Sequence, residues 1–361
     1  MLSVPMNDRH RSDIPSQRVT SPEFFFSRRG FLSTVGLGLL GTPLGIANTQ
    51  AETQTPQSTL LDVPFQRPDV FPTQRNQNYA LPRAITNTVP LLGRPSGLTD
   101  TSVPTSREVA ASHNNFYEFL AGRGGPVWQF CGEFNVEPWK IEITGECHNP
   151  MTLDLDDLFA FDHEERLYHF RCVERWAMNV PWSGFPLSRL LEQVRPTRAA
   201  RHVRFETLVA RDQMPGVTGA GWYSWPYREG LRLDEAMNEL VMVVTGVYGE
   251  PLLRQHGAPV RIIVPWKYGY KSPKSIVKIE LLHDEPQTFW RAEQPHEYGF
   301  LSNVNPNIPH PRWPQNVSYW LDTEEQFVTP IFNGYQRFVA DLYPDEPRRP
   351  QQPIHPGQNT R

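Results

Sequence analysis

Proline is the residue that most restricts what this chain can fold into. It occupies 36 of the 361 positions, roughly twice its ordinary share. Because proline lacks a backbone N–H and breaks helix interiors, we expect short strands, short helices and many loops. Hydrophobic residues make up 39% of the sequence, enough for a sizeable core. The expected class is a mixed α+β fold with much irregular structure.

Charge, hydropathy and cysteine content exclude several classes of protein. The formal net charge of −4 gives no indication of a basic surface for nucleic acid. The body of the chain lacks a run of about 18 apolar, uncharged residues, which excludes a polytopic membrane protein. Three cysteines are too few for a disulfide scaffold. Without Gly-x-Gly-x-x-Gly or Cys-x-x-Cys, a dinucleotide fold, a thioredoxin-like centre and covalently attached haem are also not indicated.

The amino terminus has the pattern of a twin-arginine export signal. Residues 27–33 read Ser-Arg-Arg-Gly-Phe-Leu-Ser, and residues 34–47 are uncharged, mildly apolar and rich in glycine. This pattern predicts export to the periplasm with cleavage near residues 47–51; the alternative is a chance arginine pair before a core helix. Since this route carries folded proteins, often with a cofactor, it favours a redox enzyme over a fast-folding periplasmic binding protein.

The chain is expected to divide into three parts. These are a signal peptide at 1–51, an extended lead-in rich in Pro, Thr and Gln at 52–112, and a single catalytic domain at 113–361. In the last part, short apolar runs alternate with turn residues. Strands are predicted at 140–144, 168–172, 202–207, 241–245, 259–264 and 275–282, and short helices at 153–159, 186–194 and 234–238.

Cys172 is the first candidate for chemistry. It ends a strand-like run between Arg171 and Arg175, and alternation along a strand would place Cys172 and Glu174 on one face. Arginine charge lowers the pKa of a nearby thiol and so favours the thiolate that binds metals. The alternative is a buried structural cysteine. Cys131 and Cys147 could pair in an oxidising compartment or remain separate thiols.

A cluster of cations is the second candidate. Lysine occurs at five positions, and four of them lie within residues 267–278, shortly after Arg261. Four cations near serine, glycine and exposed backbone suit an anionic group such as a phosphate. The alternative is a solvated loop.

Together these segments resemble the sulfite oxidase family of molybdopterin enzymes, and most closely its branch that reduces methionine sulfoxide in periplasmic proteins. The resemblance covers about residues 112–345. The motifs that carry it are Asn114-Asn115-Phe116-Tyr117-Glu118-Phe119, Arg171-Cys172-Val173-Glu174, Val180-Pro181-Trp182-Ser183-Gly184-Phe185-Pro186-Leu187, residues 229–237, Gly257–Val260, Val264–Tyr268, Glu297-Tyr298-Gly299-Phe300 and Asn303-Val304-Asn305-Pro306.

The resemblance implies a β-rich molybdopterin-binding fold and a set of site residues. Cys172 matches the cysteine that ligates molybdenum. Ser272 and Pro273 depart from the usual glycine-first pattern, and Pro273 removes one backbone N–H that could bind an anion. Asn115, Glu174 and Trp176 are candidates for shaping the site or delivering protons. The positions that match cofactor contacts are Asn114, Tyr117, Glu118, Thr207, His256, Arg261, Ser272, Pro273 and Lys274.

The implied activity is reduction of methionine sulfoxide residues in proteins by oxygen-atom transfer at a Cys-ligated molybdenum, with one molybdenum-molybdopterin per chain. Electrons would come from a membrane haem-containing, quinol-linked subunit (MsrQ-like), since the chain has no haem or flavin motif. The alternatives are a sulfite dehydrogenase and a binding protein without molybdenum. Sulfite dehydrogenases usually add a dimerisation domain, and the roughly 50 residues after Pro311 are too few for one. This favours a monomeric reductase.

Overall fold

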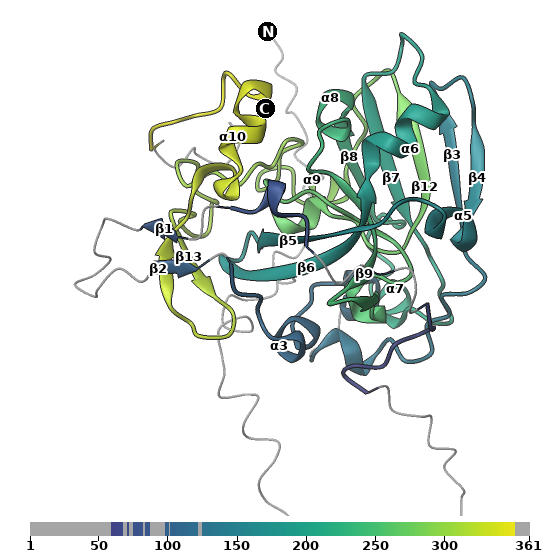
Figure 1. Cartoon of the computed structure of the whole chain (residues 1–361), viewed down its shortest axis with the longest axis horizontal. Coiled ribbons are helices and arrows are strands. Elements are labelled where there is room, and N and C mark those ends of the chain that lie inside the picture. Colours follow the sequence, from purple (N-terminus) through teal and green to yellow (C-terminus); the bar gives the residue numbers. More distant parts are fainter. Residues whose placement is uncertain are drawn as a thin grey trace, which may run out of the picture. The chain divides into compact units, whose positions relative to one another are not determined.

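The computed structural model describes residues 59–67, 71, 75–81, 84–86, 98–100, 102–121 and 125–350 (Figure 1). The arginine pair and the expected cleavage site lie outside these residues, so the export signal stays a prediction, as do the three proposed parts of the chain. Within the described ranges no helix is both long enough and apolar enough to cross a membrane.

The first large sheet has seven strands and is built around a long hairpin. Strand β5 (Glu164–Arg171) pairs antiparallel with β6 (Trp176–Pro186), and every residue of β6 is buried. β6 also pairs antiparallel with β9 and parallel with β13. The remaining bounds are β9 (Met242–Val247), β10 (Glu250–Pro251), β11 (Arg261–Ile263), β13 (Val317–Trp320) and β14 (Gln326–Val328).

The second sheet has five strands in the order β4-β3-β12-β7-β8, and Figure 1 shows these strands side by side. Strands β3 and β12 are parallel, and the other neighbours are antiparallel. Burial alternates along β7, because one face of this sheet packs on the core. The bounds are β3 (Lys140–Gly145), β4 (Met151–Asp154), β7 (His202–Thr207), β8 (Arg228–Arg232) and β12 (Ile276–Leu282); β1 (Ala84–Thr86) and β2 (Leu98–Asp100) form a separate pair.

The helices in the described part are short, as the proline content predicted. The longest, α6 (Leu187–Val194), buries its leucines against β6 and ends at Arg195, which has a left-handed φ of 54°. Helix α5 (Leu155–Phe159) begins at a reciprocal cap between Asp154 and Asp157. The other α-helices are α3 (Arg107–Ser112), α4 (Tyr117–Leu120), α7 (Pro215–Gly219), α8 (Leu233–Ala236), α9 (Phe289–Glu293) and α10 (Gln336–Val339).

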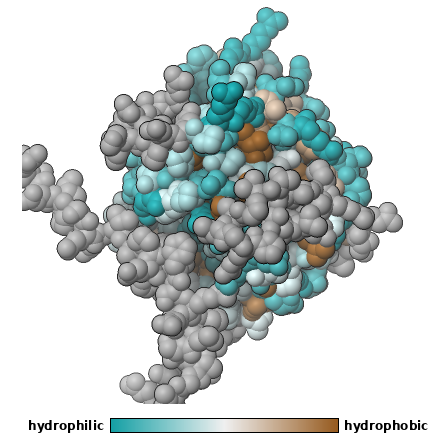
Figure 2. Space-filling model, turned by 90° about the vertical axis from the view of Figure 1, so that its left-hand side faces the viewer, coloured by the Kyte–Doolittle hydropathy of each residue, from teal (hydrophilic) through white to brown (hydrophobic). Residues whose placement is uncertain are grey.

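Single 3-10 turns connect many of these elements. They are η1 (Gln77–Tyr79), η2 (Val127–Gln129), η3 (Arg254–His256), η4 (Gly269–Lys271), η5 (Ile331–Gly334) and η6 (Ala340–Leu342). On the face shown in Figure 2, apolar residues form small separate patches among hydrophilic ones.

The α+β class and all six predicted strands are confirmed, with ends shifted by a few residues. The central strand β6 was missed, because Pro181 lies inside it and proline is rare in central strands. β6 tolerates this proline because its pairing with β9 starts only at Trp182, and the carbonyl of Pro181 accepts from Tyr248 N at 3.0 Å. β13 and β14, which follow Pro311 in the described part of the chain, extend the first sheet.

Candidate functional site

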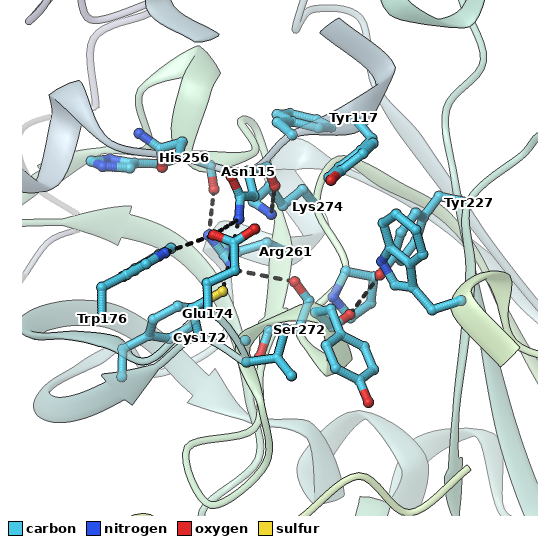
Figure 3. A pocket seen from close by; sticks show the side chains of 18 of the residues that line it. Asn115, Tyr117, Cys172, Glu174, Trp176, Tyr227, His256, Arg261, Ser272 and Lys274 are labelled. Atoms are coloured by element: carbon cyan, nitrogen blue, oxygen red, sulfur yellow. Dashed lines mark hydrogen bonds between the residues drawn. The ribbon is translucent and has the colours of Figure 1, made fainter. Parts of the chain in front are cut away.

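A pocket lies where the β5–β6 turn, the start of α4 and two loops of residues 256–274 meet (Figure 3). The predicted residues that line it are Asn114, Asn115, Tyr117, Glu118, Cys172, Glu174, Trp176, His256, Arg261, Ser272, Pro273 and Lys274.

Cys172 lies in the tight turn that joins β5 to β6. The backbone N–H of Cys172 donates to Trp176 O at 3.0 Å, and that of Arg175 donates to Cys172 O at 3.0 Å. Arg175 has a left-handed φ of 79°. Cys172 and Glu174 do reach the same pocket, but the strand alternation that predicted this is wrong. The turn, not a strand, brings the two side chains together.

Two hydrogen bonds fix the carboxylate of Glu174 beside the thiol. Asn115 Nδ2 and Trp176 Nε1 each donate to Glu174 Oε2 at 3.0 Å. The same Asn115 nitrogen lies 3.7 Å from Cys172 Sγ. Figure 3 shows these four side chains facing one another on one side of the pocket. The thiol therefore has a carboxylate and an amide within its reach.

The predicted lowering of the thiol pKa by a flanking arginine is present for Arg171, but larger effects outweigh it. Burial, followed by the charge of Glu174, raises the pKa of Cys172, and Arg171 and Lys274 oppose this only in part. Arg171 is buried and donates to Ser318, Gln315 and the Cys172 carbonyl, whereas Arg175 donates to Val317 O. A bound metal cation would supply the charge that the thiolate needs.

Arg261 is a buried cation with only neutral partners. Its terminal nitrogens donate to His256 O at 2.8 Å and Ser272 O at 3.1 Å, and its Nε has no hydrogen-bond partner. Burial lowers the pKa of Arg261 to about 9. Among the described residues no carboxylate forms an ion pair with it. An uncompensated buried charge of this kind suits an anionic ligand.

Lys274 is a second cation of the same kind. Its Nζ donates to Asn115 O at 2.9 Å, and no carboxylate of the described residues lies within ion-pair distance. Burial and the neighbouring charge of Arg261 lower the pKa of Lys274 to about 7, although Glu118 opposes them. The two cations therefore destabilise each other until an anion lies between or beside them.

His256 also has an unused polar atom in this region. Its Nε2 lies 3.1 Å from Ala110 O, which fixes the proton on that nitrogen, and Nδ1 is buried without a partner. Burial lowers the pKa of His256 to about 3, so the ring is neutral at pH 7. Nδ1 is then an acceptor that a ligand donor could satisfy.

Thr207 is the one predicted cofactor contact that does not line the pocket. Its hydroxyl donates to Glu118 Oε1 at 2.8 Å and thereby orients that carboxylate from behind. Burial raises the pKa of Glu118 to about 7.

Asn114 lines the pocket and donates to Ala111 O at the end of α3. Ser272 Oγ accepts from Val264 N at 3.1 Å, which holds the loop before Lys274.

The prediction that the four clustered lysines share an anion is wrong. Lys267 and Lys271 are buried in ion pairs with Glu235 and Glu229, each at 2.6 Å. Lys278 lies on β12, partly exposed, with carboxylates at 3.8 and 3.9 Å. Only Lys274 reaches the pocket. These lysines are close together in the sequence. In the fold their side chains point in different directions and so do not meet at one site.

Sequence reasoning missed the aromatic wall of the pocket. Tyr117 contacts Trp290 edge to face at 4.8 Å, and Trp290 contacts Tyr298 at 5.4 Å. Arg261 lies 4.9 Å from the ring of Trp182. These rings come from segments far apart in the sequence, so no local spacing could reveal them. The additional aromatic lining residues are Phe116, Phe170, Trp182, Tyr227, Tyr270, Trp290 and Tyr298.

The donor set constrains what metal site is feasible here. All three cysteines are free, so Cys131 and Cys147 are not joined. In the described part, no three His, Cys, Asp or Glu side chains are placed to hold a metal ion. A metal bound at Cys172 would therefore need most of its ligands from a cofactor. Together with the two cations that lack a carboxylate partner, the pocket fits a metal carried by an anionic cofactor.

Comparisons with known proteins agree with this chemistry. Residues 129–290 match a family described as the oxidoreductase molybdopterin binding domain. The chain is 45% identical over 271 residues to the protein-methionine-sulfoxide reductase catalytic subunit MsrP of Burkholderia mallei (strain ATCC 23344), covering 73% of this chain and 81% of that protein. The sulfane dehydrogenase SoxCD from Paracoccus pantotrophus is similar at a TM-score of 0.39 and 17% identity, over 57% of this chain and 53% of the other, which is too weak to support an inference.

Proposed function

Because this chain belongs to the family of protein-methionine-sulfoxide reductase catalytic subunits and carries an oxidoreductase molybdopterin binding domain, we propose that it reduces methionine sulfoxide residues in proteins with Cys172 as the molybdenum ligand. The molybdopterin oxidoreductase predicted from the motifs is confirmed at the level of the family. The observation that carries the proposal is a buried thiol in one pocket with two buried cations, Arg261 and Lys274, that lack a carboxylate partner.

The residues of the pocket divide into those that would hold the cofactor and those that would meet the substrate. Arg261 and Lys274 would bind its phosphate, and His256 Nδ1 would accept a hydrogen bond from it. Cys172 would bind the metal through its thiolate. When bound, the molybdenum-molybdopterin cofactor supplies oxygen-atom transfer and two-electron redox chemistry. The positive charge of the metal would also lower the thiol pKa that burial otherwise raises.

The substrate side chain would lie between Cys172 and the aromatic wall. Sulfur and its methyl group pack favourably against aromatic rings, and Tyr117, Trp290 and Tyr298 supply such rings. Glu174 is held over the thiol by Asn115 and Trp176. Once it has taken up a proton from solvent, its carboxyl would pass that proton toward the oxygen removed from the sulfoxide.

Location and electron supply complete the proposal. The arginine pair at residues 28–29 supports twin-arginine export to the periplasm, with signal cleavage near residues 47–51. Electrons would come from a membrane haem-binding, quinol-linked subunit. The description of the Burkholderia relative as a catalytic subunit supports a separate partner of some kind.

The decisive assay supplies the purified, molybdenum-loaded protein with a reduced dye and a Met-oxidised protein. We expect the dye to be oxidised as methionine sulfoxide is consumed. Metal-loaded protein that leaves the sulfoxide intact but oxidises sulfite would instead establish a sulfite dehydrogenase. Protein that never retains molybdenum would establish the binding-protein alternative.

Replacing Arg261 with methionine should weaken cofactor binding without weakening the apoprotein. Loss of a charge-assisted hydrogen bond to phosphate should lower cofactor affinity about tenfold or more, whereas removing an uncompensated buried cation should leave the apoprotein equally stable or more stable. Molybdenum per chain and the unfolding temperature of the apoprotein measure the two effects. Arg204→Met is the control, because Arg204 pairs with Glu206 and Glu280 outside the pocket. Full molybdenum content in the Arg261 variant would contradict the assigned role.

A further inference from the structure

Trp222 is an exposed aromatic residue with no role in the site described so far. Its relative exposure is 62%, and in the described part of the chain only Val103, at 58%, is another exposed large hydrophobic residue. Tryptophan is usually well buried, because its large apolar surface gains from leaving water. A single exposed indole is not informative by itself, but one that continues into further aromatic surface is a candidate contact residue.

The loop that carries Trp222 is firmly attached to the body. Ser224 N donates to Glu293 Oε1 on α9 at 2.9 Å. Trp225 Nε1 donates to Ala220 O at 3.1 Å, and Tyr223 N donates to the same carbonyl at 3.1 Å. The three residues that follow Trp222 are therefore held by hydrogen bonds. Trp222 is exposed on a loop that these bonds fix to the rest of the protein.

Trp222 lies at the outer end of an aromatic series that leads into the pocket. Its ring is 5.9 Å from that of Tyr223. Tyr223 in turn contacts Tyr117 at 6.4 Å and Trp290 at 6.2 Å, and both of these line the pocket. Tyr117 and Tyr298 line the same pocket as Glu174 and Cys172. The series therefore runs from solvent to the residues around Cys172.

We propose that the Trp222 indole binds the polypeptide that flanks the oxidised methionine, with a preference for an apolar neighbouring residue. This rests on the proposed function. A methionine side chain is short, so the substrate backbone must come to the mouth of the pocket before its sulfoxide can reach Cys172. The residues on either side of it then lie at the rim, where Trp222 and Tyr223 offer aromatic surface. An apolar side chain there would bury the exposed indole, whereas glycine would not.

The test compares three sulfoxides with the molybdenum-loaded enzyme: N-acetyl-methionine sulfoxide amide, a peptide with the sulfoxide flanked by phenylalanine, and one with it flanked by glycine. Trp222→Ala should raise KM for the phenylalanine-flanked peptide about tenfold, a change of about 1.4 kcal/mol. KM for the other two sulfoxides and kcat for all three should stay the same. Trp222→Phe should restore most of the preference, because a ring remains.

Val103→Ala is the matched control. Val103 is similarly exposed, but only its backbone carbonyl is used, by Asn179 Nδ2. An unchanged ratio of KM values between the two peptides in Trp222→Ala would overturn the inference while leaving the reductase function intact. Failure of the wild-type enzyme to reduce even the small sulfoxide would overturn the function itself, and this inference with it.

Discussion

Replacing Cys172 with serine is expected to abolish sulfoxide reduction and leave the fold intact. Serine keeps the size of the side chain, but its hydroxyl ionises far less readily than a thiol and is a poor ligand for a soft metal site. Little structure depends on the sulfur, since its only hydrogen-bond contact in the described part is Asn115 Nδ2 at 3.7 Å. A loss on the order of a thousandfold in turnover corresponds to about 4 kcal/mol of transition-state stabilisation.

The measurement is dye oxidation with a Met-oxidised protein, alongside circular dichroism and the unfolding temperature. Cys147→Ser provides the control, because Cys147 is a half-buried free thiol outside the pocket. We expect it to retain wild-type turnover. Full activity in Cys172→Ser would remove this residue from the mechanism, whatever the state of the cofactor.

The second large effect is expected from Lys267→Met, and it concerns stability. Lys267 Nζ is completely buried and donates to Glu235 at 2.6 Å, Leu301 O at 2.7 Å and Asn303 at 2.9 Å. Methionine would fill the space but leave the Glu235 carboxylate buried without its cation. Breaking a buried pair from one side costs about 3–5 kcal/mol.

Chemical denaturation of the apoprotein measures this loss. Lys278→Met is the matched control, because Lys278 is partly exposed and its nearest carboxylates are 3.8 and 3.9 Å away; we expect a change within about 0.5 kcal/mol. Adding Glu235→Gln to Lys267→Met should recover part of the stability, because it removes the buried carboxylate charge that has lost its cation. Equal effects of the two lysine variants would show that the buried pair contributes no more than a surface pair.

Patterns in the sequence predicted β3, β5, β7, β9, β11 and β12, but not the short strands β4, β8, β10, β13 and β14. The strand predicted at 202–207 coincides with β7, in which buried residues alternate with partly exposed ones. The prediction failed at β6, since both of its faces are buried and a proline interrupts its pattern. A strand of that kind has no alternation to detect. β6 also begins directly after the turn that carries Cys172.

Composition and short motifs by themselves determined the α+β class, the family and 12 of the 23 residues that line the pocket. These are local properties: proline limits helix length, and a motif lists residues whatever surrounds them. The tertiary structure alone decided which charges are compensated. Arg171 and Arg175 donate to Ser318 and to the Val317 carbonyl, Lys267 and Lys271 form ion pairs with buried glutamates, and Lys274 reaches the pocket. It also assembled the aromatic wall, because burial and electrostatic pairing depend on contacts between segments that are distant in the chain.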